Sequence, residues 1–257
     1  MAVMSGLMAV LVLAVLSSRA GTSGGQPVTA AHKVPVWSLL LMGAAALAVS
    51  VAELPRYPVQ TAGLLAASVL LIGIFVLVDW RMHVAVLPHS VFGPGPLKWI
   101  YLTMSVQMVA AMVTTYVPLF GQRLGNLTPV AAGFLGASLA VGWTASEIVS
   151  ASVNNTRVIA HVVAAAPLVM ASGLALGAVT QRADAPGVVA LWALALLITG
   201  TGIGIAWPHL SAWAMDSVDD PAESGAAAAA INIVQLISAA FGAGLAGVVV
   251  NRAEGAK

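Results

Sequence analysis

The chain has 257 residues, of which 60% are apolar and 7% are charged, and its formal net charge is +1. An ordinary soluble domain carries about 25% charged residues, so this composition favours a lipid bilayer over water as the main solvent. The small net charge argues against a nucleic-acid partner, and the absence of cysteine excludes disulfides, thiolate metal sites and thiol catalysis.

Polar and turn-forming breaks divide the chain into about eight apolar segments, most of them near the length of about 20 residues that a helix needs to cross a bilayer. In lipid, such runs satisfy their backbone hydrogen bonds only as helices, and they lack the alternation of a membrane β-barrel. The sequence therefore predicts an all-α, polytopic transmembrane helix bundle. The predicted spans are Ala2–Ser17, Val34–Val51, Thr61–Val78, Trp99–Leu119, Val130–Val149, Val158–Thr180, Gly187–Trp207 and Ala226–Val250.

The first of these segments, Ala2–Ser17, is short for a span, and a cleaved signal peptide is the alternative. No positive residue precedes it, and no clear small-residue cleavage pattern follows before Arg19. We therefore favour a membrane span for this segment.

Motifs of soluble enzyme chemistry are missing from the sequence. It contains no G-x-S-x-G elbow, no H-E-x-x-H helix and no phosphate-binding G-x-x-x-x-G-K, and its five histidines lack the spacing of metal ligands. We therefore expect that the protein is not an enzyme and that it uses no cofactor.

Ionisable side chains inside predicted spans are candidates for function, because charge is unfavourable in a bilayer. Glu147 lies near the end of its span, and Trp143 lies one turn earlier on the same helical face. Glu147 is either a substrate or proton-coupling residue or an interfacial carboxylate that pairs with Arg157. His161 lies just inside the next span and is either a proton relay or a solvated side chain.

Uncharged polar side chains also occur at membrane depth. Gln107 lies in one span, and Asn232 and Gln235 share a face of the last span. Because lipid offers no hydrogen-bonding partner, we expect these side chains to point into the bundle, where they either join helices or line a cavity. Tyr116 and Trp143 would add contact area for an amphipathic ligand.

Small residues recur at four-residue spacing in the later spans, a pattern typical of closely packed membrane helices. Tight packing is one explanation, and the alternative is a hinge for a rocking transporter. The candidate packing or hinge positions are Gly173, Gly177, Gly200, Gly204, Pro208 and Gly244.

Four stretches of the chain carry a family resemblance through their order. Asp79–Phe92 combines an acidic-basic pair with Leu-Pro and Phe, and Tyr116–Gly133 contains Pro-Leu, Gln, Gly, Pro and Ala-Gly. Gly200–Pro208 is glycine-rich, and Gly225–Gly247 is rich in small residues. In this order they resemble the major facilitator superfamily, specifically its fourteen-span drug:proton antiporter branch (EmrB/QacA type), with the chain covering family spans six to thirteen.

The resemblance implies a division of the chain. Residues 1–96 would hold family span six, two linker spans and a connector, and residues 97–257 would hold a five-span portion of the C-terminal transporter bundle. It also implies a proton-coupled antiporter in the plasma membrane, which exports small amphipathic molecules or drugs by alternating access and so contributes to drug resistance.

The expected partners are the lipid bilayer, a small amphipathic substrate, a proton, and either a missing N-terminal bundle or a second copy. The chain departs from the family in lacking about five earlier spans, including the one with the antiporter motif, and in the loop Ser152–Arg157. We therefore expect that the chain alone does not transport. A non-transporting membrane scaffold or accessory subunit is the alternative from another functional class.

Overall fold

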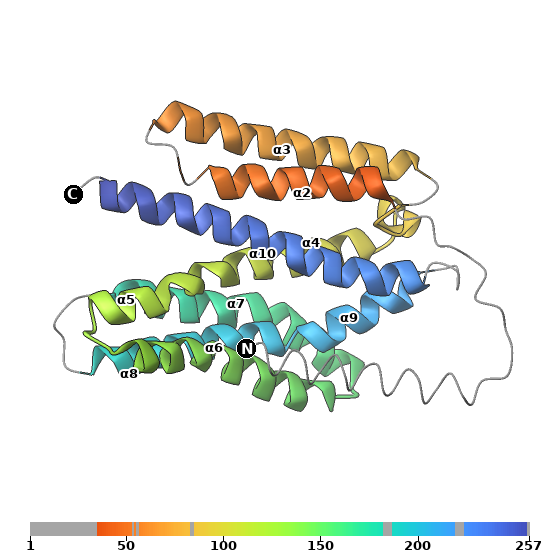
Figure 1. The fold of residues 1–257 in the computed structure, drawn as a ribbon. Helices are drawn as coiled ribbons and strands as arrows, with labels where there is room; N and C mark the ends of the chain where they lie inside the picture. Colours follow the sequence, from red (N-terminus) through yellow and green to blue (C-terminus); the bar gives the residue numbers. More distant parts are fainter. Residues whose placement is uncertain are drawn as a thin grey trace, which may run out of the picture. The chain divides into compact units, whose positions relative to one another are not determined.

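The computed structural model describes residues 35–52, 54, 57–82, 85–181, 187–218 and 224–255. All regular structure in these ranges is helical, which confirms the predicted all-α class. In chain order the elements are α2 (Val36–Val51), α3 (Pro58–Arg81), η1 (His89–Phe92), α4 (Leu97–Ala111), η2 (Met112–Tyr116), α5 (Val117–Arg123), α6 (Pro129–Ala151), α7 (Thr156–Thr180), α8 (Val188–Gly204), α9 (Trp207–Asp216) and α10 (Ser224–Gly255) (Figure 1).

Six helical stretches in the described residues are long and apolar enough to cross a membrane. The chain is therefore a multi-pass membrane protein, as predicted. The stretches are Val59–Arg81, Leu97–Arg123, Pro129–Ala151, Thr156–Thr180, Val188–Asp216 and Gly225–Arg252.

Two of the predicted spans need separate comment. The second, Val34–Val51, corresponds to α2, an apolar helix of 16 residues that is shorter than the six. The first, Ala2–Ser17, lies outside the described residues.

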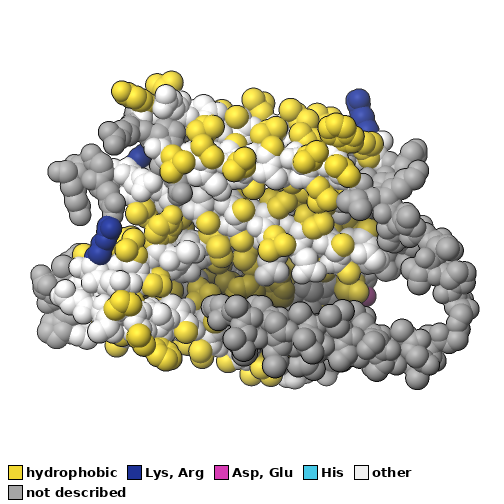
Figure 2. Space-filling model, in the orientation of Figure 1, with side chains coloured by type: hydrophobic (Ala, Val, Ile, Leu, Met, Phe, Trp, Pro, Cys, Tyr) yellow, Lys and Arg dark blue, Asp and Glu magenta, His cyan; other side chains and the backbone are white. Residues whose placement is uncertain are grey.

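Large apolar side chains cover the surface of the helices. Val59 is 81% exposed, Phe134 75% and Leu168 73%, each in a different helix. Figure 2 shows apolar side chains spread over the visible face, with the few charged ones near the ends of the helices. Water would oppose such a surface, whereas lipid tails accept it.

Local sequence sets where two of the long helices begin. At α6, the hydroxyl of Thr128 accepts a hydrogen bond from the Ala131 N–H at 3.3 Å, and Pro129 follows in the first turn. At α7, the side-chain oxygen of Asn155 accepts from the Arg157 N–H at 3.0 Å. The loop Ser152–Arg157 therefore contains the cap of α7.

Glycines let α8 approach α6 closely. A Cβ on Gly200 would overlap the carbonyl oxygen of Leu139 and lie 2.8 Å from the backbone nitrogen of Trp143. A Cβ on Gly204 would overlap the carbonyl of Trp143 and the hydroxyl of Ser146. Because these neighbours are mostly backbone, both positions bring two helix backbones together, as small residues do in membrane bundles.

The other glycine candidates differ in their surroundings. A Cβ on Gly173 of α7 would lie 2.6 Å from the backbone nitrogen of Thr199 in α8, and one on Gly244 of α10 would overlap Val49 of α2. A Cβ on Gly177 would lie 3.8 Å from its nearest neighbour, so this position has room for a side chain.

The main hydrophobic core lies where α4, α7, α8, α9 and α10 meet. Met104 and Met108 of α4 are 0% and 2% exposed, so both belong to this core. The buried cluster includes Leu97, Ile100, Met104, Met108, Ala166, Met170, Ile203, Trp207, Leu210, Ile231 and Val234.

Two of the spans are interrupted helices. The stretch Leu97–Arg123 passes from α4 through the 3-10 segment η2 into α5, and Pro118 lies in the first turn of α5. The stretch Val188–Asp216 breaks between α8 and α9, with Pro208 in the first turn of α9 (Figure 1). Proline has no N–H to donate, so it weakens the helix one turn before it. The predicted end at Trp207 was therefore wrong, because the break interrupts the span without ending it.

Candidate functional site

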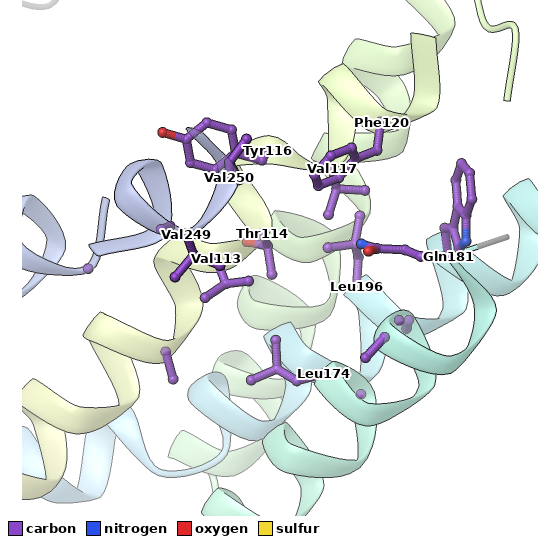
Figure 3. Close-up of a pocket in the computed structure, with 18 of the residues that line it drawn as sticks. Val113, Thr114, Tyr116, Val117, Phe120, Leu174, Gln181, Leu196, Val249 and Val250 are labelled. Atoms are coloured by element: carbon purple, nitrogen blue, oxygen red, sulfur yellow. The ribbon is translucent and has the colours of Figure 1, made fainter. Parts of the chain in front are cut away.

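An apolar cavity of about 820 Å³ lies between four parts of the bundle, which are the continuous stretch from α4 to α5, α7, α8 and α10. Its volume falls within the range of ordinary small-molecule sites, about 300 to 1,000 Å³. Figure 3 shows the side chains that line it, contributed by all four parts of the bundle. The apolar lining residues include Val109, Val113, Val117, Phe120, Leu174, Leu196, Leu245, Val249 and Val250.

Polar groups in the lining are few. Thr114 and Tyr116 come from η2, and Arg123 comes from the end of α5. Gln181 follows the last turn of α7 (Figure 3). The Thr114 hydroxyl donates to the Ala111 carbonyl at 2.6 Å, so its hydrogen is already used within the helix.

The wall formed by α7 and α8 is held in place by local contacts. Gly173 and Gly177 line the cavity without side chains, which leaves space on this side. The Trp192 indole N–H donates to the Thr180 carbonyl at 3.0 Å, and this bond fixes the ring at the edge of the cavity. Apolar walls with a few polar groups suit an amphipathic molecule.

Among the residues singled out in the sequence, Tyr116 lines this cavity and Gln107 does not. Gln107 lies in the middle of α4 and is 2% exposed. Neither its amide nitrogen nor its amide oxygen has a hydrogen-bonding partner among the described residues. Its side chain points into the bundle, as we expected, but it forms no hydrogen bond to another of the described helices.

Trp143 and Glu147 lie together on α6, away from the cavity lining. The Trp143 ring packs on the ring of Trp207, with centroids 5.8 Å apart and an interplanar angle of 59°. Glu147 is half-buried one turn later, and it forms no hydrogen bond or ion pair with another described residue. The alternative pairing with Arg157 is therefore absent from this part of the chain.

Asn232 and His161 lie on the outside of the described helices. The Asn232 side chain is exposed and its amide donates to the Ala228 carbonyl at 3.3 Å. The expectation that it points inward was wrong, because α10 turns Ala227, Ala230 and Val234 to the core.

The other two polar candidates differ in exposure. Gln235 is half-buried. His161 is exposed, and its Nδ1 lies 2.6 Å from the Arg157 carbonyl one turn earlier. Because a carbonyl only accepts, Nδ1 carries the hydrogen.

His209 is a buried polar residue that the sequence reasoning missed. It is 7% exposed, and its Nε2 lies 3.0 Å from the hydroxyl oxygen of Ser150, which is 4% exposed. The Ser150 hydroxyl also lies 2.7 Å from the Ile205 carbonyl at the break between α8 and α9. The sequence offers one signal for this residue, a histidine directly after Pro208 in an apolar stretch. A search for histidines at the spacing of metal ligands does not find it.

The Ser150 and His209 pair does not have the geometry of an activated nucleophile. The Ile205 carbonyl only accepts, so the single hydroxyl hydrogen of Ser150 points to it. His209 must then donate its Nε2 hydrogen to Ser150. A histidine that acts as a general base would instead accept the hydroxyl hydrogen.

Asp79 is the second buried ionisable residue that the structure reveals. It is 0% exposed near the end of α3, and its two carboxylate oxygens accept from the Val86 and Leu87 N–H groups at 2.8 and 2.9 Å. The acidic member of the connector motif therefore fixes the chain that leads from α3 to α4.

Comparison with known proteins finds two curated relatives of this chain. The chain is 77% identical over 257 residues to two curated proteins from strains of Mycobacterium tuberculosis, each named a probable multidrug-efflux transporter. The match covers 99% of this chain and 55% of each relative, so the chain spans about half the length of the curated relatives it matches. No family model matches the chain, and no solved structure matches it.

Proposed function

We propose that this chain forms part of a membrane transporter that exports small amphipathic molecules, and that the apolar cavity is part of the substrate path. The cavity is the observation that carries the proposal, since its lining combines apolar side chains with a few polar groups. The names of the two relatives support the same class of function.

The interrupted spans support a mechanism of alternating access. In many secondary transporters, discontinuous helices lie beside the binding site and let one part of the bundle move against another. Here η2 contributes Thr114 and Tyr116 to the cavity, and α8 contributes Trp192 before its break. We propose the drug:proton antiporter branch of the major facilitator superfamily as the family, with these residues in one bundle and the other bundle on a further part of the protein or a second copy.

Binding of an amphipathic fluorescent dye to the chain in lipid nanodiscs tests the role of the cavity. Gly177→Leu places a side chain at a cavity-lining position where the nearest atom is 3.8 Å from a Cβ. We expect dye binding to weaken by about 10-fold or more, because a misfit in an apolar pocket is worth about 1 to 3 kcal/mol.

The matched control is Gly133→Leu on the exposed face of α6, where a Cβ meets no atom within 4 Å. This variant adds the same side chain outside the cavity, so its dye binding should equal that of the parent chain. Equal binding by the parent and by Gly177→Leu would contradict the assignment of the cavity.

Transport itself requires a second measurement. We expect vesicles that contain only this chain to show no dye efflux driven by a pH gradient, because one bundle cannot provide access from both sides. Robust efflux in these vesicles would refute the need for a second bundle. When the chain is reconstituted with the proposed second bundle, loss of efflux in folded Glu147→Gln would favour transport through this residue, whereas no effect would favour a scaffold or an interfacial carboxylate.

A further inference from the structure

A second cavity, of about 440 Å³, lies at the other end of the bundle from the first. It is lined by the beginning of α4, the early part of α7 and α9, whereas the first cavity is lined by later parts of α4 and α7. The two cavities share no lining residue. The second cavity is therefore a separate place where a ligand could bind.

This second cavity lies where the membrane-spanning stretches end. Leu97 is the first residue of one stretch and Asp216 is the last residue of another, and their helices α4 and α9 pack on each other. Trp99 lines the cavity near this boundary, where the ring of a tryptophan is favourable. The lining residues Ile100 and Leu210 are buried and apolar. A ligand with a polar head and an apolar body would match this placement.

Asp216 gives the second cavity a negative charge. Its side chain is exposed and forms no hydrogen bond or ion pair with another described residue. Asp216 is also the last residue of α9, where the helix dipole is negative, so a cation beside it would be favourable. The ammonium of Lys98 on α4 instead donates to the Gly93 carbonyl at 3.2 Å. The cavity therefore favours a positively charged ligand.

The other polar groups of the second cavity favour a ligand that donates hydrogen bonds. The Thr103 hydroxyl donates to the Trp99 carbonyl at 2.8 Å, so its oxygen can only accept from a ligand. The Asp216 carboxylate also only accepts, and the Ser217 hydroxyl can accept or donate. Trp99 and Trp213 supply indole rings, whose faces attract cations. A primary ammonium combines positive charge with three N–H donors and so fits this lining.

We propose that the second cavity binds the headgroup of a phospholipid with a primary ammonium, of the phosphatidylethanolamine class. The ammonium donates to Asp216 and Thr103 beside the indole rings. The acyl chains lie along the exposed apolar face of α4, where Leu102 and Val106 follow Trp99 at helical spacing. An anionic headgroup would be repelled by Asp216, and a choline headgroup has no N–H to donate.

This inference does not rest on the proposed function, because a phospholipid surrounds the bundle whether or not a substrate is transported. Native mass spectrometry of the detergent-solubilised chain tests it first without any variant. Phosphatidylethanolamine, phosphatidylcholine and phosphatidylglycerol with identical oleoyl chains are added in turn. We expect phosphatidylethanolamine to bind about 10-fold more tightly than phosphatidylglycerol, with phosphatidylcholine between them, because charged hydrogen bonds form only with the first.

Two variants then place the binding in this cavity. Asp216→Asn keeps the size of the side chain and removes its charge, so phosphatidylethanolamine should bind about 10-fold more weakly and its preference over phosphatidylglycerol should shrink. Trp99→Leu should weaken phosphatidylethanolamine binding about 3-fold through loss of an indole face. Trp37→Leu is the matched control, because Trp37 is 66% exposed near the start of α2, Trp99 is 63% exposed, and only Trp99 lines the cavity. This control should bind as the parent does.

Several results would overturn the inference. The headgroup assignment fails if the parent binds phosphatidylethanolamine no more tightly than phosphatidylcholine or phosphatidylglycerol. The location fails if folded Asp216→Asn and Trp99→Leu both bind phosphatidylethanolamine as the parent does, or if Trp37→Leu loses as much binding as Trp99→Leu.

A competition experiment separates a lipid from a free cationic amphiphile. Dodecylammonium carries the same primary ammonium on a single chain, and we expect it to displace phosphatidylethanolamine only weakly because it fills less of the apolar face. Binding of dodecylammonium at least as tight as that of the phospholipid would assign the cavity to a free amine instead. Because no dye is present, none of these results bears on the first cavity or on the proposed transport.

Discussion

Replacing Gly200 by alanine should weaken the contact between α6 and α8. The new Cβ would overlap the Leu139 carbonyl oxygen and lie 2.8 Å from the Trp143 backbone nitrogen, so one helix must move. Alanine favours a helix over glycine by about 1 kcal/mol, whereas overpacking typically destabilises by about 1 to 3 kcal/mol. The displaced helix would also stretch the contact between the Ser146 hydroxyl and the Thr201 carbonyl. The Ser146 hydrogen is shared with the Trp143 carbonyl, at 3.0 Å against 3.3 Å for Thr201, so this loss adds at most the value of about 0.6 kcal/mol that a membrane hydrogen bond has.

The expected net change in the free energy of unfolding for Gly200→Ala is about 1 to 2 kcal/mol of destabilisation. Unfolding by denaturing detergent in mixed micelles, followed by circular dichroism, measures it. Gly133→Ala is the control, because a Cβ there meets no atom within 4 Å and only the gain in helix propensity remains. The reasoning fails if Gly200→Ala is as stable as Gly133→Ala.

Further expectations concern three buried polar side chains. Gln107→Leu should stabilise the fold by about 1 kcal/mol in the same unfolding assay, because it removes two buried polar atoms without partners; a loss of stability would mean that the amide has one. Ser150→Ala should destabilise by about 1 to 3 kcal/mol, since it leaves the buried Nε2–H of His209 unpaired, and an unchanged unfolding midpoint would contradict this. Asp79→Asn should increase hydrogen exchange in 86–92, because an amide has one accepting oxygen for two N–H donors; unchanged exchange there would count against the clamp.

The bundle class and most span positions could be predicted because they depend on composition along the chain. A long apolar run in lipid satisfies its backbone hydrogen bonds by forming a helix, so the positions of the helices follow from the positions and lengths of the runs. The extension from Trp207 to Asp216 was missed because Pro208 ends many helices, and only the packing of α9 shows that this one continues. The outward position of Asn232 depends on which face of α10 the neighbouring helices bury.

The candidate site was less predictable because its parts are distant in the sequence. Ser150 and His209 are 59 residues apart, and no local pattern indicates that their side chains meet. The cavity arises from the spacing of four helix segments rather than from a motif, so the sequence indicated Tyr116 as a ligand contact without indicating its neighbours. The glycine spacing predicted that helices pack closely, but it did not show which glycines make the contact. The structure shows that Gly200 has no room for a side chain, whereas Gly177 has room for one.

The turn at Ile205 and Ala206, which joins α8 to α9, has a mechanical consequence. The Ser150 hydroxyl of α6 donates to the Ile205 carbonyl, and the Ser146 hydroxyl of α6 lies within hydrogen-bonding distance of the Thr201 carbonyl. Helix α6 therefore contacts the backbone at both ends of the last turn of α8. A swing of α9 about this joint would therefore drag the end of α6 with it. The two segments would then move together, because two serine hydroxyls and the contact between the Trp143 and Trp207 rings join them.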